Sequence, residues 1–362
     1  MSFVEEDDVM VAMEDMVVRL FGDVLGSELP GPFPRLSYEE ALRHYGSDRP
    51  DLRIPMVLVD IAELMTDVEF KVFSGPATTP GSRVAALRVP GGAALSRQQI
   101  DGYTEFVGLY GAKGLAWIKV NDLSTGRDGL QSPILKFLPE AVIDEIVRRT
   151  EVQTGDLVFF GADTASVVND ALGALRVRLG HDMNLTDGSW RPLWVVDFPL
   201  VEHNPETRQW QSLHHPFTAP RETDLDLLDS DPGRVLSRAY DMVLNGTEIG
   251  GGSIRNHRSD IQARILALLG IDAQEAAEKF GFLLDGLRYG APPHGGIAFG
   301  LDRIVAMMAG EESIRDVIAF PKTLKASCLL TGSPSEVAQN QLRELGIRTR
   351  VAQPAAAGQE TP

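Results

Sequence analysis

The 362-residue sequence predicts an α+β fold in which a compact block over residues 54–187 interrupts a larger α+β unit. Three observations lead to this prediction. Apolar residues recur at helical spacing near the N-terminus, strand and helix patterns are mixed through the middle of the chain, and the pattern becomes mostly β from Trp190 onward. The glycines of the middle block fall between its predicted elements, and few catalytic-looking polar clusters lie in it. We therefore interpret it as an inserted domain.

The segment before the block is predicted to be helical. Residues 9–24 place valine, methionine, leucine and phenylalanine on one helical face, and Gly26 is a plausible stop. The methionines of this face are predicted to be core residues. Ser37-Tyr-Glu-Glu40 has the pattern of a capping box that opens a short helix, which Gly46 ends. A turn-rich run over 46–55 then leads into the block.

Within the block, the predicted elements follow one another closely. Apolar alternation returns near Glu69–Phe73 and again in Arg83–Val89 and indicates extended segments, and Ser96 caps a helix that runs to about Tyr110. Further predicted elements are a strand over 115–120, a helix over 139–149, a strand over 157–161 and a helix over 165–180.

The part that follows carries two hairpin signals. Strands over 193–201 and 209–213 flank the turn Asn204-Pro-Glu-Thr, and strands over 240–244 and 247–250 flank Asn245-Gly246, the strongest short hairpin signal. Ser259 is predicted to cap a helix through Leu269. The remaining elements are a helix over 273–287, a strand over 296–299 and a helix over 301–308. Residues 351–362 are predicted to be a disordered tail, because they are rich in alanine, proline, glycine and glutamine.

Composition excludes several classes of protein. The formal charge of −17 disfavours a general nucleic-acid coat protein, although a local basic patch can still serve a specific RNA. Cys328 is the only cysteine, so a disulfide framework and a thiolate metal site are excluded within one chain. No apolar run is long enough for a membrane span and no signal peptide is visible, so we expect a cytoplasmic protein. Gly295 and Gly300 have P-loop spacing, but Leu301-Asp302 stands where Lys-Ser/Thr is required.

Two clusters near the hairpins combine polar and glycine residues. Leu213-His-His-Pro-Phe217 follows a predicted strand, where two adjacent histidines point opposite ways and only one can face a given site. Three glycines, 250–252, lie inside a predicted strand between Glu248 and Arg255, and such glycines suit a place where a ligand or another backbone approaches closely. Strict alternation puts Glu248 and Arg255 on opposite faces, whereas a bulge re-aims one of them. A surface loop and a flexible β-loop are the alternatives.

Two more clusters lie at element ends. Gly295–Arg303 leads from a strand into a helix, and it places Arg303 in the first helical turn, where the helix dipole disfavours a cation. This placement indicates either a function or an ion pair with an acid such as Asp302. The polar turn Tyr45–Arg53 is either a functional loop or an ordinary domain linker.

Together and in this order, these segments resemble the bacterial aspartyl-tRNA synthetase family. The resemblance rests on five segments: YGSDRPDLR, HHPFT, YDMVLNGTEIGGGSIR, KFGFLLDGLRYGAPPHGGIAFGLDR and IRDVIAFPKT. The fourth segment, together with the residue after it, contains FGLDRI. The resemblance covers about residues 1–350. It implies a class II synthetase fold, an antiparallel sheet with flanking helices, in two parts over 1–53 and 188–350. It also implies that 54–187 is the GAD insertion domain of the bacterial form.

The resemblance implies roles for individual residues. Arg303, with Gly300, Leu301 and Asp302, matches the third class II motif, whose arginine lies against ATP. Glu248 matches the acid that helps to hold ATP with its Mg²⁺, and Arg255 the arginine that clamps the aspartate side chain. His214 matches the histidine of the amino-acid pocket. The implied reaction activates L-aspartate with ATP to aspartyl-adenylate and transfers it to tRNA(Asp), without a prosthetic group; acceptance of tRNA(Asn) stays open.

The resemblance also implies missing parts. Met1 aligns just after the family's second motif, so the anticodon-reading OB-fold, the first motif with its share of the homodimer interface, and the second motif are expected to be absent. We therefore expect this chain alone to activate aspartate poorly and not to fold as one stable catalytic domain. Three explanations stay open: a fragment of a longer synthetase, half of a split enzyme completed by an upstream polypeptide, or a paralogue that binds tRNA or a partner through the GAD-like block.

Overall fold

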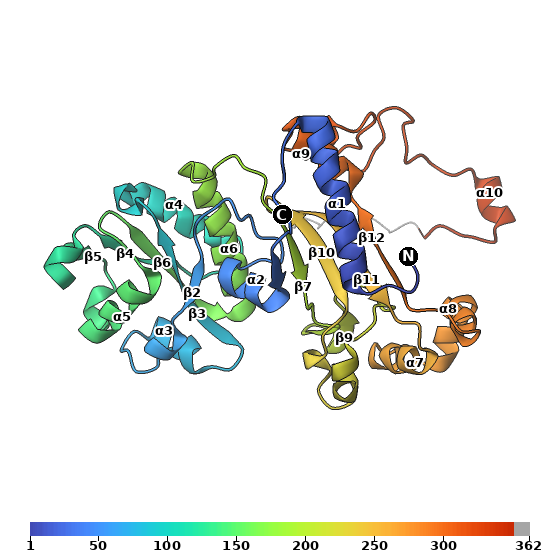
Figure 1. Cartoon of the computed structure of the whole chain (residues 1–362), viewed down its shortest axis with the longest axis horizontal. Coiled ribbons are helices and arrows are strands. Elements are labelled where there is room, and N and C mark those ends of the chain that lie inside the picture. The colour runs from blue at the N-terminus through green and yellow to red at the C-terminus, as the bar shows by residue number, and fades with distance from the viewer. Residues whose placement is uncertain (351–362) are drawn as a thin grey trace, which may run out of the picture. The chain divides into compact units, whose positions relative to one another are not determined.

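The computed structural model describes residues 1–350 and divides into two compact units, the first over Met1–Leu301 and the second beginning at Asp302. The predicted disordered tail, 351–362, lies outside the described residues. Within the described residues, no helix is long and apolar enough to cross a membrane. Figure 1 shows the elements of the chain in order of colour.

The N-terminal helix α1 (Glu6–Leu25) confirms the predicted helical face. Val9, Met10, Val17 and Phe21 are buried, and Gly26 ends the helix in the left-handed conformation at φ 63°. The Nε1 atom of Trp194 donates to Glu14 Oε1 at 2.8 Å, which fixes the helix against a strand of the first sheet. Met10 is therefore a core residue, as predicted, whereas the prediction was wrong for Met16, which is 40% exposed, and the predicted apolar face does not extend to Val24, which is 62% exposed.

The first sheet has five strands in the order β1-β7-β10-β11-β12. Its pairs are antiparallel except for the edge strand β1, which lies parallel to β7, so the predicted antiparallel sheet holds for the other four strands. The strands are β1 (Arg35–Ser37), β7 (Pro192–Val196), β10 (Ala239–Leu244), β11 (Thr247–Arg255) and β12 (His294–Phe299).

Both predicted hairpins are present. Asn245 and Gly246 join β10 to β11 with φ values of 49° and 83°, the positive pair that a tight hairpin turn of the primed type requires. The other hairpin joins β8 (Val201–Asn204) to β9 (Gln209–Ser212) as a separate two-stranded sheet. The predicted single strand over 193–201 was wrong, because Asp197 takes a φ of 60° and separates β7 from β8.

The inserted block has its own five-stranded antiparallel sheet, in the order β2-β3-β6-β4-β5. Alternate residues of its central strands enter two separate hydrophobic clusters, one on each face. Leu87 and Phe159 pack under α4 and α6, while Val158 and Phe160 pack toward α3 and α5. The elements are β2 (Leu58–Asp60), α3 (Lys71–Thr78), β3 (Ser82–Val89), α4 (Arg97–Gly108), β4 (Ala116–Val120), β5 (Leu130–Gln131), α5 (Glu140–Thr150), β6 (Leu157–Thr164) and α6 (Ala165–Asp182).

Two local predictions were wrong. The segment near Glu69–Phe73 starts helix α3 rather than a strand, because the rings of Phe70 and Phe73 meet at helical spacing, 4.9 Å between centroids. Ser259 is the first residue of α7 (Ser259–Leu268), and its N-cap is Arg258, whose side chain makes no capping hydrogen bond. The capping boxes at Ser37 and Ser96 are confirmed.

The remaining helices complete the chain. They are α2 (Tyr38–Tyr45), α8 (Ala273–Arg288), α9 (Leu301–Ala309) and α10 (Gln339–Glu344). Short 3₁₀ turns occupy Ala62–Leu64, Gly92–Ala94, Leu123–Gly129, Leu135–Phe137, Glu222–Leu228, Pro232–Arg234 and Ile314–Asp316.

Candidate functional site

A β-bulge sets the direction of Glu248. In the register of β10 and β11, Glu248 is opposite Val243 and Gly250 is opposite Met242, so Ile249 is the extra residue. The extra residue shifts the alternation and puts Glu248 on the same face of the sheet as Asp241 and Arg255. Of the two alternatives given for this strand, a bulge rather than strict alternation is present, and its extra residue is Ile249 rather than a glycine.

Two carboxylates converge over Gly251. A Cβ atom on this glycine would lie 2.8 Å from Asp241 Oδ1 and 3.0 Å from Glu248 Oε1, so both acids occupy the space directly above it. Sequence reasoning missed Asp241. A signal was present, because Asp241 is the one charged residue in the strand Ala239–Leu244, all of which is buried.

The surroundings of Asp241 favour a cation. Its side chain is 8% exposed and its Oδ1 atom makes no hydrogen bond within the described residues. Burial, together with Glu248 and Asp48, raises the pKa of Asp241 to about 8, because three carboxylates share one region. A cation placed between the carboxylates would relieve both the repulsion and the unsatisfied oxygen.

The donor set resembles a magnesium site rather than a fully enclosed metal site. No group of three or more candidate metal ligands occurs in residues 1–350. Mg²⁺ keeps several waters and usually takes only one or two protein carboxylates together with substrate phosphates. Asp241 and Glu248 therefore fit a Mg²⁺ ion that arrives with a nucleotide.

His214 lies close enough to Glu248 to feel its charge. Its ring meets the Phe198 ring edge-on at 4.3 Å, and desolvation lowers the pKa of His214, while Asp48 and Glu248 act in the opposite direction. Asp48 belongs to the Tyr45–Arg53 cluster, so one residue of that turn lies close enough to influence the site. His215 has a local role as well, since its Nδ1 atom accepts a hydrogen bond from the Phe217 N–H at 3.2 Å.

Arg255 ends β11 as a half-buried cation. Burial lowers the pKa of Arg255, and its guanidinium makes no hydrogen bond or ion pair with a side chain or backbone group of residues 1–350. Burial, together with the nearby Arg255 charge, lowers the pKa of His215. A half-buried guanidinium with unused donors is suited to a carboxylate ligand.

The three glycines serve different purposes. Only Gly251 opens on the face of Asp241 and Glu248. A Cβ on Gly250 would lie 2.7 Å from the Phe299 ring, and one on Gly252 would overlap the carbonyl oxygen of Gly296. Of the two alternatives given for these glycines, the approach of a neighbouring strand therefore applies to Gly250 and Gly252, which allow β11 to pack against β12.

The third-motif residues lie at the boundary of the two units. The Gly300 N–H donates to Ile249 O at 2.9 Å, which ties the end of β12 to the bulge of β11. Leu301, which is 70% exposed, begins α9. Asp302 and Arg303 belong to the second unit, where they occupy the first turn of that helix, as predicted for Arg303.

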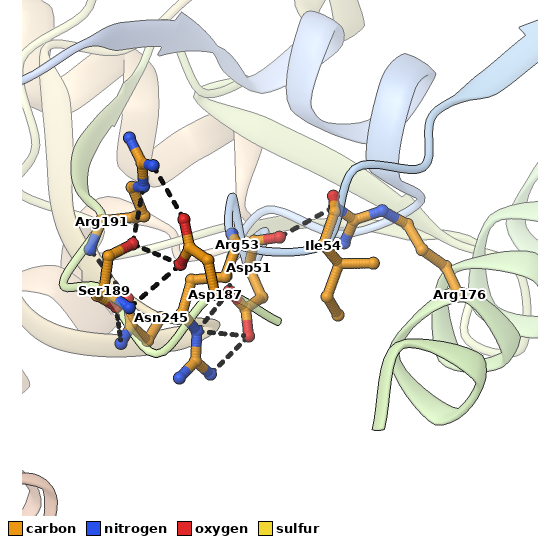
Figure 2. Close-up of polar contacts among 8 residues, drawn as sticks. All are labelled: Asp51, Arg53, Ile54, Arg176, Asp187, Ser189, Arg191 and Asn245. Carbon is orange, nitrogen blue, oxygen red and sulfur yellow. Dashed lines mark hydrogen bonds and ion pairs between the residues drawn. The ribbon is translucent and has the colours of Figure 1, made fainter. Parts of the chain in front are cut away.

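The turn Tyr45–Arg53 is held in place by two sets of polar contacts (Figure 2). Arg53 forms a bidentate pair with Asp51, at 2.9 and 2.6 Å, and the buried Arg176 of α6 donates to backbone carbonyls that include Ile54 O at 2.7 Å. On the returning connection, Asn245 of the hairpin tip accepts from the Arg191 N–H at 2.9 Å. Both connections of the inserted block are thus fixed by hydrogen bonds.

Comparison with known proteins identifies the family. The family model described as tRNA synthetases class II (D, K and N) matches residues 1–324, which is most of the chain. The chain belongs to this family. Its mixed architecture of helices and a largely antiparallel sheet agrees with that membership.

Two solved structures are similar to this class II synthetase chain. One is a putative aspartyl-tRNA synthetase from Leishmania major Friedlin, with 25% identity over 39% of this chain and a TM-score of 0.27. The other is an Entamoeba histolytica asparaginyl-tRNA synthetase in complex with asparaginyl-adenylate, with 15% identity over 90% of this chain and a TM-score of 0.38. The chain spans only 22% and 46% of their respective lengths. Both TM-scores are below 0.5.

Proposed function

We propose that this class II synthetase chain carries the aspartate- and ATP-binding face of an aspartyl-tRNA synthetase. The observation that carries the proposal is the placement of Asp241, Glu248 and Arg255 on one face of β10 and β11, with His214 close enough to Glu248 to feel its charge. This face offers two carboxylates for a metal and a half-buried guanidinium for an acid. An aminoacyl-adenylate site needs both kinds of group.

Arg255 would select the amino acid. Its planar guanidinium suits the side-chain carboxylate of aspartate, and it would leave donors unpaired against the neutral amide of asparagine. Its half-buried position strengthens this preference, since unpaired donors cost more away from water. His214 would border the same pocket, beside the acidic pair.

Asp241 and Glu248 would hold the Mg²⁺ that accompanies ATP. The cation would offset charge on the phosphates while the α-carboxylate of aspartate attacks the α-phosphate, giving aspartyl-adenylate and pyrophosphate. The terminal ribose hydroxyl of tRNA(Asp) would then take the aspartyl group and release AMP. Arg303, with Gly300, Leu301 and Asp302, would contribute the third-motif contacts to ATP.

The domain assignment is part of the same proposal. Residues 54–187 would form a GAD-like insertion domain between the two parts of the class II domain, 1–53 and 188–350. Its separate sheet, with a hydrophobic cluster on each face, supports an independent folding unit. A role for this block as a tRNA- or partner-binding module is the second candidate function. A cytoplasmic location is also part of the proposal, as the resemblance to a tRNA synthetase implies.

The test is aspartate-dependent ATP–pyrophosphate exchange by the 362-residue chain, paired with direct binding of Mg²⁺-ATP by titration calorimetry. We expect Mg²⁺-ATP binding that weakens with Arg303→Ala and with Asp241→Asn. Exposed Arg234→Ala is the matched control, because Arg234 makes only a 4.0 Å pair with Asp231. Binding unaffected by either site variant would refute the assignment of ATP to this face.

Amino-acid preference is tested separately. Arg255→Gln should remove the preference for aspartate over asparagine, both in exchange and in protection of the chain from thermal unfolding by each amino acid. If the chain alone gives no exchange, the same measurements are repeated with an upstream synthetase polypeptide added. A preference for asparagine in the unsubstituted chain would contradict the proposed specificity.

A further inference from the structure

A cavity of about 800 Å³ lies where the inserted domain meets the tip of the β10–β11 hairpin. It is lined by the turn Tyr45–Arg53, the hairpin tip Asn245-Gly246 and helix α6, together with Phe106 near the end of α4 and Tyr110 just after it. None of the residues to which we assign aspartate or ATP lines this cavity.

The walls of the cavity are preformed. Arg176 is 1% exposed and donates to three backbone carbonyls, that of Asp51 in the turn and those of Ile54 and Met56 just after it, at 2.8, 2.7 and 2.5 Å. The turn also packs backbone to backbone on α6, because a Cβ on Gly46 would overlap Asn169 O. A ligand would therefore meet a surface that needs little ordering, which favours binding.

The cavity is basic in an acidic protein. Its lining holds four arginines, Arg49, Arg53, Arg176 and Arg178, against Asp51 and Asp170, whereas the whole chain has a net charge of −17. Arg49 is exposed and makes no ion pair within the described residues, and Arg178 pairs only with the solvent-exposed Asp182 of its own helix. Arg49 is available to an anionic ligand, and Arg178 would exchange a surface ion pair, which contributes little stability, for a contact with the ligand. The sign of the charge disfavours a cation or a basic peptide.

Aromatic rings accompany the arginines. Phe106 and Tyr110 meet edge to face at 5.4 Å, and the Arg178 guanidinium lies 6.0 Å from the Phe106 ring. Tyr110 lines the cavity and is 40% exposed, so part of this residue is accessible to a ligand. Arginines that reach a phosphate backbone beside rings that stack on bases are the usual chemistry of single-stranded nucleic-acid binding. A bare phosphate would use the arginines but not the rings.

We propose that this cavity binds a single-stranded segment of RNA. Arg49 and Arg178 contact backbone phosphates on its two sides, and a base stacks on Tyr110. The assignment rests on the proposed function in one respect, that a tRNA synthetase has an RNA substrate. It adds a contact region on the inserted domain, away from the face that carries Asp241 and Glu248.

The experiment measures binding of a fluorescently labelled, unstructured 12-nucleotide RNA to the full 362-residue chain by anisotropy at several salt concentrations. The variants are Arg49→Glu with Arg178→Glu, and Tyr110→Ala. The matched control is Arg148→Glu, since Arg148 is likewise exposed, lies in the same inserted domain and pairs within its own helix, with Glu145. Far-UV circular dichroism checks that each variant is folded.

We expect the double charge reversal to weaken RNA binding at least ten-fold. The slope of log affinity against log salt should fall in magnitude by about 1.4, because each lost phosphate contact on a single strand contributes about 0.7. Tyr110→Ala should weaken binding about ten-fold with the salt slope unchanged, because stacking is worth that order of affinity per base. Arg148→Glu should change neither quantity.

Three results would overturn the proposal. Equal losses in Arg148→Glu and in the double variant would show only a diffuse charge effect. Complete competition by millimolar pyrophosphate, with no effect of Tyr110→Ala, would show a small-anion site. RNA binding untouched by all variants, with a protein partner lost instead, would assign the cavity to a protein. None of these measurements uses ATP or aspartate, so this proposal and the proposed function succeed or fail separately.

Discussion

The two five-stranded sheets of this protein differ in what one of their faces carries. The sheet of the inserted domain is buried on both faces by apolar clusters, and alternate residues of β6 enter one cluster or the other. The first sheet has, on one face of β10 and β11, Asp241, Glu248 and an uncovered glycine at 251. Both faces of the inserted sheet are packed by apolar side chains, whereas the first sheet contains a buried carboxyl group, that of Asp241, with an oxygen that makes no hydrogen bond in the described residues.

This difference separates stability from function along the chain. Proteins depart from favourable packing mostly where a site requires it, since such departures lower the stability of the fold. Substitutions in the inserted sheet should therefore change unfolding with little effect on ATP binding, and those around Gly251 should do the reverse. Each prediction below tests one side of this contrast.

The largest expected effect is on unfolding of the inserted domain. Phe159 is 0% exposed in the middle of β6, so Phe159→Ala should lower its unfolding free energy by about 3–5 kcal/mol through lost burial and a cavity. Urea denaturation followed by tryptophan fluorescence would measure this loss, and Trp117 in β4 reports on the same cluster. Calorimetric titration below the transition should give an unchanged affinity for Mg²⁺-ATP; a parallel fall would contradict the separation.

The second prediction concerns the acidic pair. Asp241→Asn should weaken Mg²⁺-ATP binding by about 10²-fold, the size expected when one preorganised charged group is lost. Its thermal stability should stay the same or rise, because a neutral amide replaces a carboxylate buried without a full set of partners. Differential scanning fluorimetry with and without Mg²⁺-ATP checks both parts. A large loss of stability without ligand would mean that Asp241 is a structural residue.

Much of the fold could be predicted from local patterns. The capping boxes at Ser37 and Ser96, the stop at Gly26 and the Asn245-Gly246 turn each have a local physical cause, and all four are confirmed. The errors arose where a tertiary or backbone choice decided the outcome. Asp197 adopts a positive φ in the middle of an apolar run, and no local pattern in residues 193–201 predicts that the strand ends there.

The site was harder to predict than the fold. A bulge is one of the two alternatives that the sequence leaves open for Glu248. Asp241 was missed although it is the one charged residue of its buried strand, because its role comes from Glu248 on the paired strand, seven residues later in the sequence. Asp48 similarly joins the electrostatic surroundings of Asp241 from a turn far earlier in the chain. The roles proposed for His214, Glu248, Arg255 and Arg303 stay predictions until binding is measured.

The third prediction compares two adjacent glycines. In Gly251→Ala the added methyl group meets only the ends of two carboxylate side chains, so we expect weaker Mg²⁺-ATP binding with an almost unchanged melting temperature. In Gly252→Ala it meets the backbone of β12, so we expect a loss of about 1–3 kcal/mol in stability, the usual cost of overpacking. Melting temperatures and ATP titrations of both variants test this. Identical effects of the two substitutions would mean that Gly251 has no separate role.

The smallest expected effect is a pH dependence that both sheets share. Burial and a hydrogen bond to Asp182 raise the pKa of Tyr103 in the inserted domain to about 12, and burial raises that of Tyr240 in the first sheet to about 12. Since an unfolded tyrosine ionises near pH 10, the folded state holds its proton longer. Stability should therefore be unaffected below pH 10 and should fall between pH 10 and about 12.

Single substitutions divide this alkaline loss between the two sheets. Tyr103→Phe should reduce the fall in melting temperature between pH 9 and pH 11 without abolishing it, because Tyr240 still titrates. Tyr240→Phe should leave the part of the fall in melting temperature that comes from Tyr103. The double variant should show the smallest fall in melting temperature between pH 9 and pH 11. If the inserted domain unfolds as a separate unit, Tyr103→Phe should change only its transition. An effect of Tyr103→Phe on every transition would show that the two sheets unfold together, and the contrast between them would then be one of chemistry and not of stability.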